Sequence, residues 1–233
     1  EGGVLAHRLA GAQRRQLVWA DHAGKVISTL GPVDETGLAN PGVALDGRVA
    51  VSRNPQGNAD VWIYDARGTA IRFTFDPGVD SQPLWSPDGR TIYFRSGRNG
   101  PYDLFQKPVD MTTDEQLLLK TDQGKSPQDV SHDGRFLLYS SMDPTTGSDL
   151  WVLPLSGEAK PSPVARTRFD EFQGQFSPDG KWVAYVSNES GANEVYVRAF
   201  PGEGGKRQMS TGGGASPRWS RESRELYYLA PDR

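Results

Sequence analysis

Short runs of β-branched and aromatic residues recur along the chain, and polar turns rich in glycine, proline, asparagine and aspartate separate them. Runs of this length and composition are typical of β-strands. The clearest are residues 48–53, 91–96, 136–141, 182–187 and 225–230. The pattern predicts an all-β protein.

An Asp-Gly pair precedes most of these runs. Asp-Gly is a strong hairpin signal, because glycine accepts positive φ and aspartate bonds back to nearby backbone. The spacings between successive pairs are 42, 45 and 46 residues, and a degenerate pair, Glu222-Ser223, follows after 43 more. This period fits four short strands and their connections, which is one blade of a β-propeller. The predicted turn residues are Asp46 and Gly47, Asp88 and Gly89, Asp133 and Gly134, and Asp179 and Gly180.

Each repeat predicts a four-stranded antiparallel blade. A short first strand leads into the Asp-Gly turn, and the runs given above form the second strand. A polar loop ending in an acid leads to the third strand, and a weaker fourth strand closes the blade. First strands are expected at 42–45, 83–86, 128–131, 174–177 and 217–220; third strands at 61–65, 104–108, 150–154 and 195–200; fourth strands at 71–75, 116–120, 162–166 and 206–210.

The repeats predict a single propeller domain over residues 1–233 with four complete blades and two partial ones. The chain ends supply strands two to four of one blade and strands one and two of another, which do not merge into one blade. Because open sheet edges invite aggregation, we expect a segment of a longer protein whose ring has six or more blades. The expected blades are about 1–31 (partial), 40–76, 82–121, 127–166, 173–211 and 216–233 (partial).

The composition argues against several classes of function, among them nucleic-acid binding and membrane contact. The 26 Lys and Arg and the 29 Asp and Glu are interspersed, with a net charge of −3, so no basic stripe indicates a nucleic-acid partner. No apolar run approaches the length of a membrane span, so we expect no direct membrane contact in this segment. The absence of cysteine excludes disulfides and thiolate metal ligands, and it selects neither an oxidising nor a reducing compartment.

Candidate catalytic motifs are weak. The Gly-Lys-Ser of residues 124–126 lacks the earlier glycine of a phosphate-binding loop, since that position is Leu119. The three histidines, His7, His22 and His132, do not form a ligand or nucleophile–base pattern. We therefore predict no catalytic residues, no metal and no cofactor within this chain.

An acid ends the loop before each third strand, at Asp60, Asp103, Asp149 and Glu194. A ring of carboxylates for cations is one interpretation. The favoured interpretation is structural, because a position repeated in every blade more often serves packing. Each acid would then fix its loop through backbone N–H groups or through the second-strand arginines Arg53 and Arg95.

Residues just before the first strands differ between blades. The first strand of a propeller blade is the innermost, so we expect these residues near one mouth of the central channel, where propellers bind ligands. A protein or peptide partner, or a small ligand, is expected there. The candidate binding residues are Asp80, Ser81, Gln82, Lys125, Ser126, Gln128, Glu171, Phe172, Gln173, Ser216 and Arg218.

The repeats resemble the TolB-like, Pro-Asp-type β-propeller family. The residues that carry the resemblance are 83–96, 126–141, 174–187 and 215–229, and it covers about 40–233 well. A narrower resemblance, over residues 14–26, 148–157 and 194–220, is to the propeller that follows the kinase domain and membrane span of bacterial receptor-like serine/threonine kinases.

The resemblance implies three alternative functions, all without catalysis in this chain. The favoured one is a ligand- or protein-binding sensor that forms the extracytoplasmic C-terminal part of such a kinase. The others are a free-standing TolB-like periplasmic scaffold and the gating propeller of a prolyl-oligopeptidase-type serine peptidase. An extracytoplasmic location is expected, and a cytoplasmic one stays open.

Overall fold

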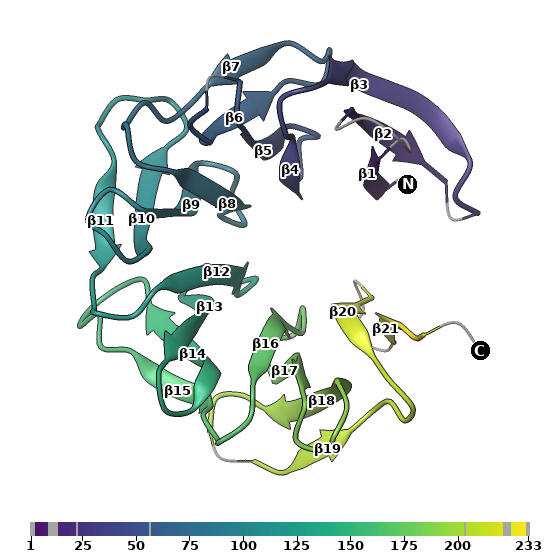
Figure 1. The fold of residues 1–233 in the computed structure, drawn as a ribbon, viewed down its shortest axis with the longest axis vertical. Helices are drawn as coiled ribbons and strands as arrows, with labels where there is room; N and C mark the ends of the chain where they lie inside the picture. Colours follow the sequence, from purple (N-terminus) through teal and green to yellow (C-terminus); the bar gives the residue numbers. More distant parts are fainter. Residues whose placement is uncertain are drawn as a thin grey trace. The chain divides into compact units, whose positions relative to one another are not determined.

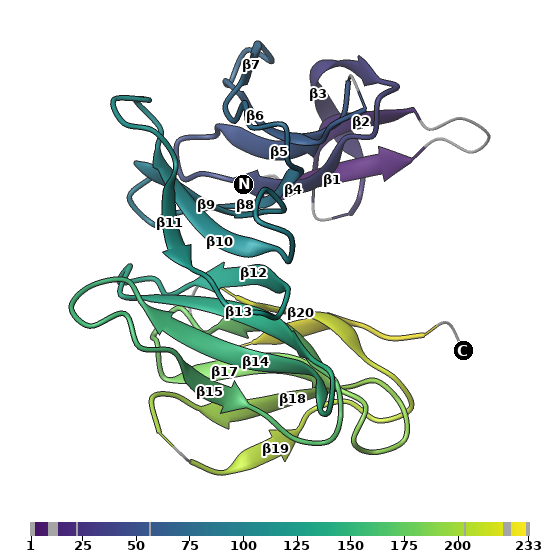
Figure 2. The same ribbon diagram turned by 60° about the vertical axis from the view of Figure 1, so that its left-hand side comes forward.

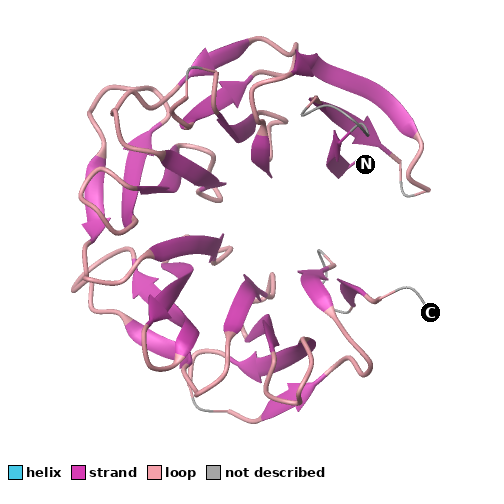
Figure 3. Cartoon of the chain, in the orientation of Figure 1, coloured by secondary structure: helices cyan, strands magenta, loops and turns pink. Residues whose placement is uncertain are grey.

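The computed structural model describes residues 3–8, 14–21, 23–55, 57–202, 204–220 and 225–231; of 3–8, only the backbone is described. This part of the chain consists of β-strands and connecting loops, as Figure 3 shows. None of its segments is a helix long and apolar enough to cross a membrane. The prediction of an all-β fold built from four-stranded antiparallel sheets is confirmed.

The chain divides into two compact units, residues 1–121 and 122–233. The first unit holds three antiparallel sheets whose strands follow chain order (Figure 1). They are β1 (Gly3–Arg8), β2 (Arg15–Ala20) and β3 (Val26–Asp34); β4 (Ala39–Val43), β5 (Val49–Arg53), β6 (Asp60–Tyr64) and β7 (Ala70–Arg72); and β8 (Asp80–Trp85), β9 (Thr91–Ser96), β10 (Asp103–Pro108) and β11 (Gln116–Leu119).

The second unit holds two four-stranded sheets and a two-stranded one. Figure 2 shows the two larger sheets side by side. The strands are β12 (Lys125–Val130), β13 (Phe136–Asp143), β14 (Gly147–Pro154) and β15 (Ser162–Ala165); β16 (Glu171–Phe176), β17 (Trp182–Ser187), β18 (Glu194–Ala199) and β19 (Lys206–Gln208); and β20 (Ala215–Trp219) with β21 (Leu226–Leu229).

The first strands begin about three residues before their predicted starts, so those boundaries were wrong. β8 begins at Asp80, β12 at Lys125 and β16 at Glu171. Each has a shift in register that interrupts its pairing with the second strand. Gln82 and Gln173 sit at these shifts with φ of 55° and 54°. An interrupted, polar strand start lacks the alternating pattern by which strands are recognised in sequence.

The apolar cores lie between neighbouring sheets. In the first unit, Val49, Val51 and Tyr64 pack with Leu17 and Leu30 of the preceding sheet. Another cluster joins the β4–β7 and β8–β11 sheets, and a third joins the β12–β15 and β16–β19 sheets. Each fully buried Leu, Val or Phe contributes about 1.5–3 kcal/mol, so packing between blades is the main source of stability.

The Asp-Gly pairs lie in the turns between first and second strands. Ser86 Oγ donates to Asp88 Oδ1 at 2.6 Å and accepts the N–H of Thr91 at 2.9 Å. Gly89 has φ of +67°, a conformation that favours glycine. The same serine-centred contacts occur in the turns of Asp133 and Asp179. In the turn of Asp46 and Gly47, Ala44 takes the place of the serine.

This difference predicts that the two turns respond differently to exchanging serine and alanine. Ser177→Ala removes the acceptor for the N–H of Trp182 and should lower the free energy of unfolding by about 1 kcal/mol. Ala44→Ser introduces the missing hydroxyl at the equivalent position and should cause no loss. Urea unfolding of both variants measures this, and a neutral Ser177→Ala would contradict the role given to the serine.

Candidate binding site

Four of the predicted binding residues are buried instead of lying at a solvated edge: Ser81, which is 6% exposed, and the three charged residues Asp80, Lys125 and Glu171. The side chains of Asp80, Lys125 and Glu171 are 0%, 1% and 1% exposed, because they start the first strands and do not precede them. Arg98 donates to both carboxylate oxygens of Asp80. Lys125 Nζ donates to a backbone carbonyl, and Glu171 accepts from Thr167. These buried positions serve the fold, and their role in binding is no longer expected to be direct.

Ser81 and the remaining predicted residues lie in or beside the first strands and form contacts there. Ser81 accepts from Arg95, and the backbone N–H of Gln82 donates to Ser52. Gln173 accepts the N–H of Ser216 at 2.7 Å, which joins β16 to β20. Ser126, Gln128 and Phe172 are half-buried, and Arg218 is exposed. Their role in ligand binding stays a prediction.

Side chains of one first strand bind the backbone of the next. Asp129 of β12 accepts the N–H of Phe176 in β16 at 2.8 Å, and Gln175 of β16 accepts the N–H of Trp219 in β20 at 2.9 Å. In the first unit the indole N–H of Trp85 donates to the carbonyl of Gly42 at 3.0 Å. Burial raises the pKa of Asp129 to about 7, although two backbone N–H groups and the charge of Arg218 lower it.

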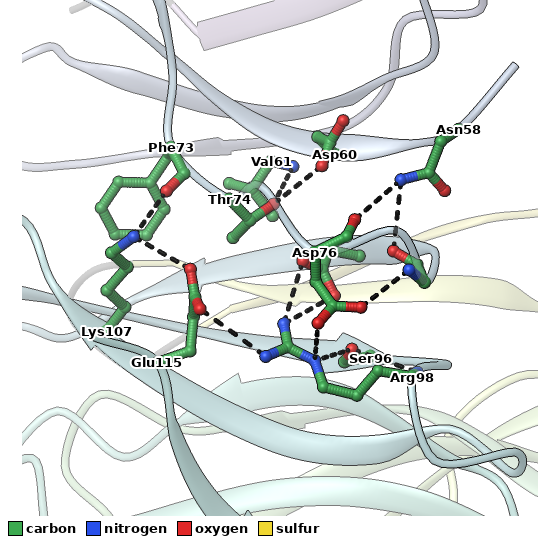
Figure 4. A network of polar contacts seen from close by, with 12 residues as sticks. Asn58, Asp60, Val61, Phe73, Thr74, Asp76, Ser96, Arg98, Lys107 and Glu115 are labelled. Atoms are coloured by element: carbon green, nitrogen blue, oxygen red, sulfur yellow. Dashed lines mark hydrogen bonds and ion pairs between the residues drawn. The ribbon is translucent and has the colours of Figure 1, made fainter. Parts of the chain in front are cut away.

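A charged network lies between the β4–β7 and β8–β11 sheets (Figure 4). The guanidinium of Arg98 lies 3.2 Å from Asp80 and 3.6 Å from both Asp76 and Glu115. Lys107 Nζ lies 2.9 Å from Glu115 and donates to the carbonyl of Phe73. Burial raises the pKa of Asp80, and Arg98 opposes that shift. The network therefore stabilises the contact between the two sheets.

Two of the third-strand acids, Asp60 and Glu194, are tied to the strand or loop that follows their own strand. Asp60 pairs with Arg72 at 2.7 Å, and Glu194 accepts from Ser210 and from the N–H of Gly213. The predicted second-strand arginine is not the partner of Asp60: Arg53 pairs with Asp34. The arginine comes instead from the fourth strand, whose end lies beside the start of the third.

A cavity of about 430 Å³ borders this network. Trp62, Phe75, Pro55 and Pro77 supply apolar lining, and the polar lining residues are Asn58, Asp60, Arg72 and Asp76. Asn58, Asp60 and Asp76 also belong to the network of Figure 4, which fixes one wall. Phe75 is 58% exposed, an unusual state for a large apolar side chain.

The cavity can hold an apolar side chain and hydrogen-bond to a backbone beside it. Within the described residues, the buried indole Nε1 of Trp62 has no hydrogen-bond partner. A buried donor without an acceptor costs about 1–3 kcal/mol. Volumes of about 300–1,000 Å³ are usual for ligand pockets. Sequence reasoning missed this site, since Phe75 reads as one more strand aromatic.

The part of the chain that the structure describes offers few other candidate catalytic or metal-binding residues. No three His, Asp or Glu side chains there are grouped to hold a metal ion. His132 lies exposed in a turn. The side chain of His7, all of His22 and the Glu222-Ser223 pair lie outside the described residues.

Comparison with known proteins places the fold among TolB-like propellers. No family profile matches the chain. It is 25% identical to the uncharacterized peptidase YuxL of Bacillus subtilis over 78% of the chain, and 26% identical to the Tol-Pal system protein TolB of Helicobacter pylori over 64% of the chain. The chain spans about a third of these relatives, 34% and 36%.

A solved structure of TolB from Acinetobacter baumannii superposes with a TM-score of 0.78 at 19% identity, over 99% of this chain and 58% of that one. The fold is therefore that of a TolB-like β-propeller. The narrower resemblance to kinase-associated propellers stays a prediction.

The buried network yields a stability prediction. Arg98→Gln leaves Asp80 buried without its cation and should lower the free energy of unfolding by about 3 kcal/mol at pH 7. Adding Asp80→Asn should recover part of that loss. Arg135→Gln is the control, since the Arg135 side chain is 68% exposed and its pair with Asp133 contributes less than about 1 kcal/mol. Equal losses for both arginines would contradict this assignment.

Asp129 yields a pH prediction. Its folded pKa, about 7, lies above its ordinary value of 3.8, so the folded state binds the proton more tightly. The contribution of this group to stability therefore falls as pH rises from about 4 to 7. The free energy of unfolding of Asp129→Asn, measured relative to wild type, should therefore increase by on the order of 2 kcal/mol as the pH rises from 5 to 8. A difference that does not change with pH in chemical unfolding would contradict the raised pKa.

Proposed function

We propose that the chain is part of a non-catalytic β-propeller that binds a protein or peptide. The observation that carries the proposal is the match to TolB, in sequence over 64% of the chain and in fold over 99%. The cavity beside Phe75 supports it, because an exposed aromatic side chain and the polar lining residues Asn58 and Arg72 suit an apolar residue and its backbone.

In its finer form the proposal makes this propeller the extracytoplasmic sensor of a bacterial serine/threonine kinase. The resemblance of residues 14–26, 148–157 and 194–220 to kinase-associated propellers supports this form. A free-standing TolB-like periplasmic scaffold is the alternative that the TolB matches support.

A second candidate function is the gating propeller of a prolyl-oligopeptidase-type serine peptidase. The match to YuxL, named a peptidase, over 78% of the chain favours it. The sequence of the parent gene separates the candidates. A kinase domain and membrane span upstream support the sensor, and a signal peptide with a small helical domain supports the scaffold. A Gly-x-Ser-x-Gly hydrolase domain downstream supports the peptidase.

Peptide binding at the cavity is tested directly with a library of random peptides displayed on phage and selected on the 233-residue chain. Selected peptides are synthesised and titrated by calorimetry. Phe75→Ala should weaken binding by about tenfold or more, because an aromatic anchor is lost. Tyr227→Ala is the matched control, since Tyr227 is also 58% exposed and should change the affinity less than about twofold.

Two results would contradict the proposal. One is the absence of any enriched peptide. The other is a set of selected peptides that bind the Phe75→Ala variant as tightly as the wild type.

A further inference from the structure

A second cavity, of about 500 Å³, lies between the β12–β15 and β16–β19 sheets of the second unit. Its lining includes Phe136 of β13, Val164 of β15, Arg198 of β18, and Arg166, Phe200 and Pro201 from the segments that follow β15 and β18. None of the functions considered above uses it. Its volume is in the usual range for ligand pockets.

The two arginines of this cavity differ in how their charge is balanced. Arg166 lies 3.3 Å from Asp143 and 3.6 Å from Asp149, so two carboxylates neutralise it. Arg198 donates to the backbone carbonyl of Val164 and forms no ion pair within the described ranges. A guanidinium has five N–H donors, and one carbonyl leaves most of them without a protein acceptor.

Apolar side chains surround this cation, and packing against the buried core fixes their positions. Phe200 packs edge-on against Phe136 with ring centroids 5.3 Å apart, and its ring is tilted against that of Phe176, with centroids 5.0 Å apart. Phe176 belongs to the buried core, and Phe136 and Phe200 pack against it. The cavity therefore presents one unbalanced positive charge beside a fixed aromatic and aliphatic wall.

We propose that this cavity binds a carboxylate carried on an apolar or aromatic group, such as the C-terminal end of a peptide with a hydrophobic last residue. Guanidinium and carboxylate match in charge and in planar, two-bond geometry. Phosphate is disfavoured, because its higher charge needs more donors than one arginine among apolar walls supplies. This site goes beyond the proposed function, and neither depends on the other.

The test uses two small probes that differ only in charge at one end. N-acetyl-L-phenylalanine carries the carboxylate, and N-acetyl-L-phenylalaninamide is neutral. In an NMR titration of the ¹⁵N-labelled chain, the acid should shift the amide signals of Arg198 and Phe200 with a Kd in the millimolar range. The amide should bind about tenfold more weakly or not at all. Equal binding of both probes would overturn the proposal.

Variants locate the charge that recognises the acid. Arg198→Gln should weaken binding of the acid by about tenfold, and Arg198→Lys should have an intermediate effect because it keeps the charge without the planar fork. Arg207→Gln, at an exposed arginine of β19, is the matched control and should bind as wild type does.

Unchanged binding by Arg198→Gln would overturn the proposal, as would inorganic phosphate causing the same shifts as the acid at the same concentration. If Arg198→Gln does not fold, the comparison of acid and amide on the wild-type chain still decides.

Discussion

The hydrogen bonds that join the first strands of neighbouring blades are the constraint on which the rest of each unit depends. Asp129 binds the backbone of the next first strand at Phe176, and Gln175 repeats that contact one blade later at Trp219. These bonds fix how adjacent sheets face each other, and the apolar side chains then fill the space between them. The cavity beside Arg198 lies between two sheets joined in this way, so its shape follows from the same constraint.

Three of the first strands, β8, β12 and β16, start with a buried charged residue. The position that starts the first strand is Asp80, Lys125 or Glu171, so one buried position carries either sign. Each needs its own partners, such as Arg98 for Asp80 and Thr167 for Glu171. Buried ion pairs add little net stability, but breaking one is costly.

The period of Asp-Gly pairs was enough to predict the fold class, the strand order and most second, third and fourth strands, because hairpin turns are encoded locally. The starts of the first strands were missed, since Gln82 and Gln173 interrupt the ladder with positive φ and their neighbours are polar. Neither cavity was predictable. The cavity beside Phe75 depends on which aromatic side chain of the repeats stays exposed. The cavity beside Arg198 depends on which arginine has no carboxylate partner. Both facts arise from packing between segments far apart in sequence.

Hydrogen exchange at the amide of Phe176 tests most directly whether contacts between first strands hold neighbouring blades together. If these contacts hold the blades together, this amide exchanges as slowly as the buried amides of β17, and Asp129→Ala speeds its exchange selectively. The amide of Ser177, which donates to the carbonyl of Trp182 within its own blade, should keep its protection. Fast exchange at Phe176 in the wild type, or equal loss of protection at Phe176 and Ser177 in the variant, would show that these contacts do not hold neighbouring blades together.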